Sequence, residues 1–413
     1  MSTAAGQLES RLLTLVTLGL VAFGLVMVYS ATSAPAALGD GDPGYYLKKQ
    51  GVYALAGLVL LVVASRMPYR TLRQLAPTLV VVSLGLLLAV LVVGQSVNGA
   101  RRWLTFGPAV FQPSELAKLA LAVWAAAYLT RKRAPRTLGE LARPLGLLAL
   151  VFCGLVLIQP DLGTAITIMV MLGGLLLVSG SPIGLLGAAG ALVSLAGLAA
   201  IWFEPYRRAR LFAFLDPWSD PQNSGFQSVQ ALIGMGSGGV VGEGLGQGIS
   251  KVFYLPEAHT DMIFAIVGEE LGLLGTTLVI AGFAVFAYTG MRIALRCKDP
   301  FGKRLAAALT TLVCAQALIN LAAVMGVAPL TGIPLPFVSY GGSSLVVLLT
   351  SVGVLLNIAT DDGGERRASV PDRGRGDRGS RAARARSGGG TRRTRSGRDV
   401  RRVAGSRRGA ARS

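Results

Sequence analysis

The sequence predicts an all-α polytopic membrane protein with about ten transmembrane helices and a long extracytoplasmic loop between helices 7 and 8. The 413 residues are 52% hydrophobic and only 15% charged, whereas about a quarter of the residues in a soluble domain are charged. Apolar runs of about 20 residues, the length of a bilayer-spanning helix, recur along the chain. Short basic loops separate some of these runs, as expected on the cytoplasmic side of a membrane.

The expected spans follow the apolar runs in chain order. They are residues 12–33, 46–65, 74–93, 113–130, 144–159, 163–179, 183–203, 263–291, 305–327 and 339–359. Among the connections, 65–73 holds three arginines, and 131–143 and 292–304 hold five basic residues each. With ten spans these three loops and both termini fall on one side, which the positive-inside bias identifies as the cytoplasm.

The opposite side receives the longest connection, residues 204–262, which is rich in Gly, Pro, Asp and Ser. A loop of this length in a compact protein is usually functional, so we expect the chemistry to face the cell exterior or periplasm. Chemistry driven by ATP is not expected there, and the chain has no GxxxxGK[ST] loop to cradle phosphates.

Residues 361–413 form a second region, distinct from the membrane domain at 1–360. They hold 17 of the arginines and six acidic residues but almost no large apolar residues, so they cannot bury a core and are expected to be a disordered cytoplasmic tail. Expected partners are anionic lipid headgroups or an acidic protein surface. Nucleic acid is not expected, because no aromatic side chain is interleaved to stack on bases.

The stretch "YLPEAHTDMIFAIVGEELG" (254–272) places several charges where the long outer loop enters the eighth span. Asp261 has two interpretations: a cap of the helix N-terminus or a site carboxylate. Glu257 and His259, the only histidine of the chain, lie within four residues of it. This grouping at the mouth of a helical bundle favours a site.

Charged residues also occur inside spans, where they face a bundle interior or a wet cavity. Glu115 and Lys118 in "QPSELAKL" are three apart and share one helix face. One interpretation is a closed ion pair between them. The other is a polar cavity lined by Glu115, Lys118 and one of Glu269 or Glu270, opening toward Asp261.

Arg102, beside Arg101 and Trp103 in "NGARRWL", is expected on the outer side. It has two interpretations: contact with lipid headgroups at the interface, or an arginine fork that holds a phosphate or pyrophosphate. Residues 207, 208 and 210, all arginines near Trp202, have the same two interpretations. "IPLPFVSYGGSSL" (333–345) combines helix-breaking prolines with paired glycines, and irregular backbone of this kind is tolerated where it lines a cavity.

Six motifs in this order over residues 12–360 resemble the SEDS family of membrane proteins, the shape, elongation, division and sporulation group. They are "NGARRWL", "QPSELAKL", "QPDLGT", "FLDPWSDPQNSGFQSVQALIGMGSGG", "YLPEAHTDMIFAIVGEELG" and "LPFVSYGGSSL". The "LPEAHTD" and "LDPWSDPQNSGFQ" stretches look more like the cell-division branch than the elongation branch. Met262 departs from the family, which commonly has Phe after the aspartate.

The resemblance implies a peptidoglycan glycosyltransferase that polymerises lipid II at the division septum of a bacterial plasma membrane. It implies a class B penicillin-binding protein as transpeptidase partner, together with other division-complex proteins. The family's essential aspartate corresponds to Asp261, which would act as general base in an inverting transfer. Positive charge from Arg, Lys or a divalent cation (Mg²⁺ or Mn²⁺) would support the departing pyrophosphate.

The expected substrate-binding residues are Arg102, Glu115, Lys118, Glu257, His259 and Glu270. Two other classes of protein fit some of the same features: a lipid II flippase, which would need the buried charges for translocation, and a non-catalytic division scaffold. An elongation-type polymerase is a further alternative. An essential acid at the outer mouth distinguishes the transferase from a transporter, whose essential acid would lie mid-membrane.

Overall fold

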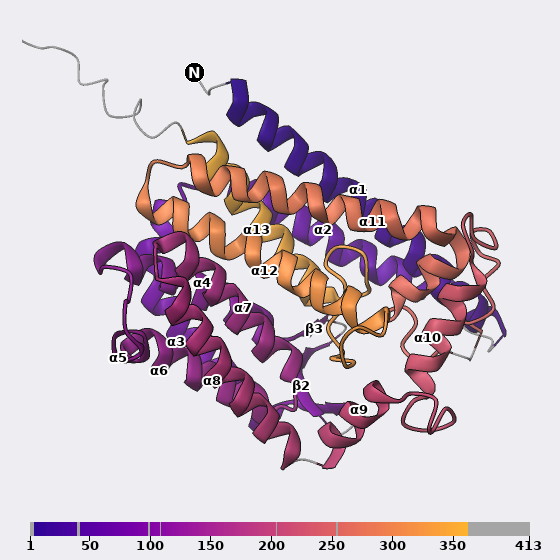
Figure 1. Ribbon diagram of the computed structural model, residues 1–413. Coiled ribbons are helices and arrows are strands. Elements are labelled where there is room, and N and C mark those ends of the chain that lie inside the picture. Colours follow the sequence, from indigo (N-terminus) through magenta and orange to yellow (C-terminus); the bar gives the residue numbers. More distant parts are fainter. Residues whose placement is uncertain are drawn as a thin grey trace, which may run out of the picture. The chain divides into compact units, whose positions relative to one another are not determined.

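A computed structural model describes residues 4–38, 42–97, 100–107, 109–203, 205–252 and 255–361 of the chain (Figure 1). One compact unit comprises Met1–Gly363. The predicted tail, apart from Asp361 at its start, lies outside the described residues, so its disorder and the boundary between two domains remain predictions.

Helices account for most of the described residues. They are α1 (Ala4–Leu38), α2 (Tyr45–Arg66), α3 (Arg70–Val93), α4 (Pro113–Arg131), α5 (Leu138–Leu141), the π-helical turn η1 (Ala142–Gly146), α6 (Leu147–Ile158), α7 (Leu162–Ser179), α8 (Ile183–Trp202), α9 (Pro205–Leu215), α10 (Phe226–Ser237), α11 (Ile263–Arg296), α12 (Pro300–Val324) and α13 (Gly342–Thr360). The all-α membrane class predicted from composition is confirmed.

Within the described ranges, eight helices are long and apolar enough to cross a membrane, and they coincide with eight of the ten expected spans. The other two expected spans are also helical. One is α8, whose apolar part covers Ile183–Ala199, and the other is α4, with 19 residues. The ten predicted segments therefore all form helices, although two do not have the length and apolarity that define a membrane span by composition alone.

Helix α4 lies at the centre of the bundle, packed against α3, α7 and α12. Thirteen of its residues are buried, and most of them are alanine or another small or apolar residue. Small side chains let helix backbones approach closely inside a membrane. A charged pair on this helix is therefore enclosed by protein.

The pairing of α2 with α13 rests on two glycines. A Cβ on Gly57 would come within 2.6 Å of the Leu349 side chain, and a Cβ on Gly353 would come within 2.4 Å of the Leu61 carbonyl oxygen. No L side chain fits at either position without displacing its neighbour, so these glycines set the distance between the two helices.

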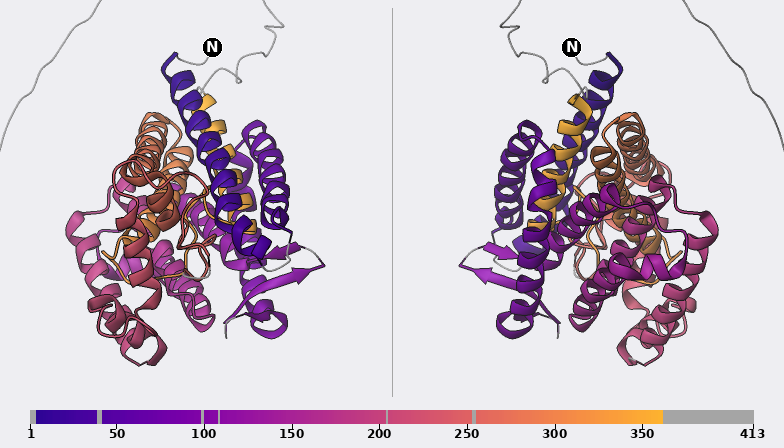
Figure 2. Two further views of the ribbon diagram at one scale, coloured as in Figure 1. Left: turned by 90° about the vertical axis from the view of Figure 1, so that its right-hand side faces the viewer. Right: turned by 90° about the vertical axis from the view of Figure 1, so that its left-hand side faces the viewer.

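A small antiparallel sheet occupies the loop before α4, where the sequence predicted no strand. Strands β1 (Gln95–Val97), β2 (Ala100–Phe106) and β3 (Ala109–Phe111) are hydrogen-bonded in the order β1-β2-β3. Leu104 of β2 pairs with Phe111 of β3. Figure 2 shows the strands at the end of the helical unit away from the start of α1.

The connection 204–262 contains two helices, α9 and α10, rather than loop alone. Both lie toward the same end of the unit as the strands (Figures 1 and 2). Helix α10 packs against the first part of α11, where Gly272 has a positive φ of 61° and interrupts the helical geometry. The predicted outer loop is thus a structured layer over the entrance to α11.

Candidate active site

Asp261 lies just before α11, which begins at Ile263. Met262 occupies the N-cap position and makes no side-chain cap hydrogen bond. The Asp261 Oδ1 atom instead accepts a hydrogen bond of 3.2 Å from the hydroxyl of Thr260. The geometry therefore gives no support to the capping interpretation and leaves the carboxylate at the helix entrance.

The backbone of Asp261 is held from a different helix. Asn320 on α12 donates from Nδ2 to the Asp261 carbonyl oxygen at 2.7 Å and to the Ile333 carbonyl oxygen at 2.8 Å. Asn320 was not singled out from the sequence, although a buried amide in an otherwise apolar span is a usable signal. Its two bonds join the Asp261 turn to the irregular segment that precedes α13.

The turn that carries Asp261 is strained at Glu257, whose φ is 55° without being a glycine. Thr260 closes this turn, because its amide and hydroxyl both donate to the Glu257 carbonyl oxygen at 3.0 Å. Unfavourable backbone conformations persist only where surrounding contacts enforce them, and they cluster at functional sites. Glu257 itself is exposed.

Burial raises the pKa of Asp261 to about 6. The negative charge of Glu257 acts in the same direction, whereas the Thr260 hydroxyl and the positive charge of Arg210 lower the pKa. Arg210, on α9, donates to the Leu330 carbonyl oxygen at 3.3 Å. The positive charge that lowers the pKa of Asp261 therefore comes from Arg210, which lies in the connection 204–262.

His259 belongs to an aromatic cluster with Tyr46 and Tyr340. Its ring centroid lies 4.5 Å from that of Tyr46 and 5.5 Å from that of Tyr340. Its carbonyl oxygen accepts the Tyr340 amide at 2.9 Å. Burial lowers the pKa of His259, so the imidazole is neutral at physiological pH and forms part of an aromatic wall.

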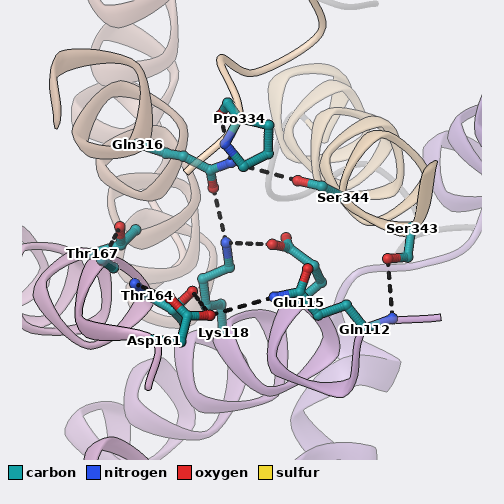
Figure 3. Close-up of polar contacts among 11 residues, drawn as sticks. Gln112, Glu115, Lys118, Asp161, Thr164, Thr167, Gln316, Pro334, Ser343 and Ser344 are labelled. Atoms are coloured by element: carbon teal, nitrogen blue, oxygen red, sulfur yellow. Dashed lines mark hydrogen bonds and ion pairs between the residues drawn. The ribbon is translucent and has the colours of Figure 1, made fainter. Parts of the chain in front are cut away.

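The predicted pair of Glu115 and Lys118 is present on α4 (Figure 3). Lys118 Nζ lies 3.0 Å from Glu115 Oε1 and 2.8 Å from the amide oxygen of Gln316 on α12. The two residues are 2% and 1% exposed. Gln316 donates onward to the Pro334 carbonyl oxygen at 3.2 Å and the Ser344 hydroxyl at 3.4 Å, so this network ends at the segment before α13 and at the first turn of α13.

A second carboxylate joins the same region from α7 (Figure 3). Asp161 caps that helix by accepting from the Thr164 amide at 3.0 Å and the Thr164 hydroxyl at 2.8 Å. The side-chain amide of Gln112 also donates to it through Nε2, at 3.4 Å. Asp161 was not predicted as part of a site, and its capping contacts account for its charge.

Glu269 and Glu270 do not join the network of Lys118. Glu270, 0% exposed, pairs with Lys251 Nζ at 2.6 Å and accepts from the Ser30 hydroxyl at 2.8 and 2.7 Å. Glu269 accepts the amides of Ile249 and Ser250 at 2.7 and 3.0 Å. The interpretation as one cavity shared by both helices is wrong, because the ion pair and hydrogen bonds of these two side chains go to the outer connection and to α1.

Arg102 is hydrogen-bonded to the turn at Gln159 and Pro160. From β2 it donates through Nε to the Gln159 carbonyl oxygen at 2.8 Å and through Nη2 to that of Pro160. The same turn reaches Ile333, because a Cβ on Gly163 would come within 2.5 Å of the Ile333 side chain. Arg102 thus supports a turn that packs on the segment held by Asn320, and its contact with substrate remains a prediction.

The divalent cation likewise stays a prediction. Over the described part of the chain, no group of three or more His, Cys, Asp or Glu side chains is arranged to hold an ion. The turn carries two carboxylates, those of Glu257 and Asp261, and Mg²⁺ is commonly held by one or two carboxylates together with substrate phosphates.

A polytopic helical membrane protein with a carboxylate at the entrance of a spanning helix is the class that fold and site define. The family described as cell cycle protein, which comprises FtsW, RodA and SpoVE, matches residues 10–363. This chain belongs to that family, the SEDS family expected from its motifs.

Curated relatives cover most of the chain. The probable peptidoglycan glycosyltransferase FtsW of Geobacter metallireducens is 42% identical over 358 residues, covering 84% of this chain and 93% of the relative. The protein of the same name from Nitrosococcus halophilus is 44% identical over 348 residues, covering 82% and 89%. The expected likeness to the division branch is confirmed.

Solved structures agree. A chain of a peptidoglycan synthase complex, described as coordinating polymerization and crosslinking, superposes with a TM-score of 0.69 at 32% identity and covers 84% of this chain and 97% of its own. The rod shape determining protein RodA of Thermus thermophilus superposes with a TM-score of 0.64 at 30% identity, covering 86% and 97%.

Proposed function

We propose that this protein is a peptidoglycan glycosyltransferase that polymerises lipid II, with Asp261 as the general base. The reaction class comes from the names of its relatives. The observation that supports the base is the state of Asp261: a partly buried carboxylate at the entrance of α11 with a pKa of about 6. A base is most effective when its pKa lies near the working pH.

The transfer needs one proton acceptor. The 4-hydroxyl of one lipid II attacks the anomeric carbon of a sugar bonded to undecaprenyl pyrophosphate, and Asp261 takes the hydroxyl proton as the new carbon–oxygen bond forms. The bond to the pyrophosphate oxygen breaks with inversion at that carbon. The pyrophosphate leaves unprotonated, so a second carboxylate as general acid is not required, unlike in a glycosidase.

Charge on the departing pyrophosphate must be stabilised. Arg210 suits this role, because its positive charge already acts on Asp261. A divalent cation, Mg²⁺ or Mn²⁺, would add positive charge there, with Glu257 as a carboxylate ligand beside the phosphates. Lipid headgroup contacts are assigned to Arg102 at the neighbouring turn and to the aromatic wall of His259, Tyr46 and Tyr340.

The buried pairs serve the site indirectly. Lys118 with Glu115 and Lys251 with Glu270 are enclosed by protein, so we assign to them the placement of the two segments that border Asp261 rather than direct contact with substrate. The network of Lys118 reaches Pro334, in the segment before α13. The network of Glu270 reaches Lys251, in the connection 204–262.

The partner and location follow from the same relationship. A relative is part of a complex that coordinates polymerization and crosslinking, so we assign this chain a crosslinking partner of the class B penicillin-binding protein type within the division complex. Its place is the plasma membrane at the septum, with both termini in the cytoplasm. The arginine-rich tail is assigned to anionic lipid or an acidic protein surface.

The test is lipid II polymerisation by the purified chain in liposomes, with and without its transpeptidase, read as glycan length on a gel. Elongated strands that depend on this chain support the proposal. A parallel assay follows dithionite quenching of fluorescent lipid II across the same liposomes. Rapid transbilayer movement without polymer would replace the transferase with a flippase.

A further inference from the structure

A pocket of about 360 Å³ opens where α4 ends and the chain turns toward α5. It lies at the opposite end of α4 from the Glu115 pair, so it is separate from the candidate active site. Its cationic lining is Lys132, Arg133, Arg136 and Arg143, and we call it the basic pocket.

The basic pocket has a strong excess of positive charge. Four cations line it against one carboxylate, Glu140. That carboxylate already accepts the backbone amide of Arg136 at 2.8 Å, and Glu140 lies within the short helix α5, whose N-cap is Thr137. The pocket therefore has a net charge of about +3 and suits an anion.

Other basic loops on the same predicted side use their cations differently. Arg70 pairs with Asp361 at 2.8 Å, and Arg292 and Arg296 both pair with Glu9. In the described ranges, the four cationic side chains of the basic pocket form no ion pair with a carboxylate. The positive-inside bias explains why cations occur in a cytoplasmic loop. It does not explain why four of them surround one cavity.

The inner surface of the pocket is apolar. Leu129 and Leu145 line it and are buried, together with Pro135. Tyr128 also lines it and stacks on Trp124, with ring centroids 5.4 Å apart. The segment that follows is a candidate membrane span, Leu138–Ile158, so the pocket combines an apolar wall with a cationic rim at the end of a span.

We propose that the basic pocket binds the phosphodiester headgroup of an anionic phospholipid from the cytoplasmic leaflet. Arginine binds phosphate oxygens bidentately, and basic pockets at the cytoplasmic ends of membrane helices suit such headgroups. The apolar wall matches the start of the acyl chains. The tail of this chain is excluded as the occupant by its charge, since it carries 17 arginines and six acids.

The test uses the full chain in phosphatidylcholine nanodiscs that contain a small fraction of photoactivatable phosphatidylglycerol. Crosslinks are mapped by mass spectrometry, and we expect them in peptides covering residues 128–145. Arg133→Ala with Arg143→Ala should lower the apparent affinity there by about thirty-fold, since each cation near an anionic surface contributes about a five-fold effect. The matched control is Arg66→Ala with Arg73→Ala, which removes two cations from another basic loop and should leave these crosslinks unchanged.

A second variant changes the charge in the other direction. Glu140→Gln removes the single carboxylate of the pocket and should increase crosslinking, which a merely misfolded loop would not do. Equal losses in the double variant and its control, or an unchanged yield in all variants, would overturn the proposal. Complete competition by inorganic phosphate or glycerol phosphate at millimolar concentration would assign the pocket to a soluble anion instead of a lipid.

Discussion

The side-chain nitrogen Nδ2 of Asn320 lies 2.7 Å from the backbone carbonyl oxygen of Asp261, although the two residues are 59 positions apart in the chain. The same nitrogen lies 2.8 Å from the carbonyl oxygen of Ile333. One buried side chain on α12 therefore fixes both the turn that presents the carboxylate and the irregular segment facing it. This relationship makes Asn320 a positioning residue for the proposed reaction.

Asn320→Ala removes both hydrogen bonds and leaves two carbonyl oxygens without this donor. We expect turnover of lipid II to fall by about 10- to 100-fold, because small displacements of a catalytic group are costly. The pH at which activity is half-maximal should stay the same, because the base itself remains. Steady-state polymerisation across a pH series measures both quantities.

Ser351→Ala is the control for Asn320→Ala. Ser351 is buried on α13 and bonds only within its own helix in the described structure, to the Val347 carbonyl oxygen at 2.9 Å. It should retain nearly full activity. If Asn320→Ala matches this control in turnover, the positioning role assigned to Asn320 is wrong.

The buried pair on α4 predicts an asymmetry between single and double variants. Lys118→Met leaves Glu115, which is 2% exposed, as an uncompensated buried charge. Removing one partner of such a pair costs about 3–5 kcal/mol, so the folded yield and thermal stability of the detergent-purified protein should drop strongly.

Replacing both members with neutral residues, Glu115→Gln with Lys118→Met, should recover much of the lost stability, since a buried pair is often nearly neutral relative to uncharged side chains. The same melting assay tests this. A double variant that is as unstable as the sum of its two single variants would show that the two residues contribute independently, without energetic coupling, and would contradict this prediction.

Arg102→Ala should weaken lipid II binding and loosen the turn at Gln159 and Pro160. Two hydrogen bonds from a charged donor are lost, each contributing about 1.5–3 kcal/mol. Binding to lipid II in nanodiscs gives the first effect, and hydrogen exchange of residues 159–163 gives the second. Arg101→Ala is the matched control, because Arg101 is exposed and makes one long contact of 3.4 Å with the Leu91 carbonyl oxygen.

Faster exchange with unchanged lipid II affinity would make Arg102 a purely structural brace. An unchanged result in both assays would return it to the interface-anchor interpretation. Either outcome would remove it from the proposed substrate contacts.

The helices were predictable because their apolar runs are long and uninterrupted, as at α2 and α13. The sheet was not, because β2 mixes two arginines with apolar residues over seven positions and its neighbours are three residues long. Strand pairing of such short segments depends on packing against the bundle, which leaves no periodic signal.

The contacts of the candidate site likewise divide into those that the sequence predicts and those that it does not. Local spacing revealed the pair of Glu115 with Lys118, because residues three apart share a helix face. The partner of Glu270 could not be read, since Lys251 lies on a separate connection and Ser30 lies 240 residues away. Contacts of this kind depend on tertiary packing, and the sequence contains several equally plausible partners for each buried charge.

The raised pKa of Asp261, about 6, predicts the pH dependence of activity. The base must be ionised, so turnover should fall about ten-fold for each pH unit below 6 and should be nearly flat from pH 7 to 8. Initial rates of polymerisation between pH 5 and 8 test this. A half-maximal rate near pH 4 would indicate an Asp261 without desolvation.

The raised pKa of Asp261 affects stability in the opposite direction: activity falls at low pH, whereas the stability that this group contributes falls at high pH. The folded state holds the Asp261 proton more tightly than the unfolded state, whose pKa is near 3.8, so stability from this group is greatest at low pH and is lost as pH rises from about 4 to 6. The loss is at most about 3 kcal/mol. In denaturation of the purified protein, the Asp261→Asn variant should lack this component.

Asp261→Asn also separates catalysis from structure. Asparagine keeps the size of the side chain and can still accept from Thr260, but it cannot take the hydroxyl proton. Loss of a general base lowers the rate by about 10²–10⁴-fold, whereas loss of a charge at a helix terminus changes stability by only about 0.3–1 kcal/mol. We expect a well-expressed protein that binds lipid II and its transpeptidase partner and makes no detectable polymer.

Asp216→Asn is the control for this variant, because Asp216 is exposed in the same outer connection and should be dispensable. Abundance, lipid II binding and glycan length are measured for both. A variant at 261 with reduced folded yield and proportionately reduced activity would indicate a structural carboxylate. Near-normal glycan synthesis by Asp261→Asn would overturn the mechanism, because the remaining carboxylate of the turn, on Glu257, is solvent-exposed and lacks the burial that raises the pKa of a base toward neutrality.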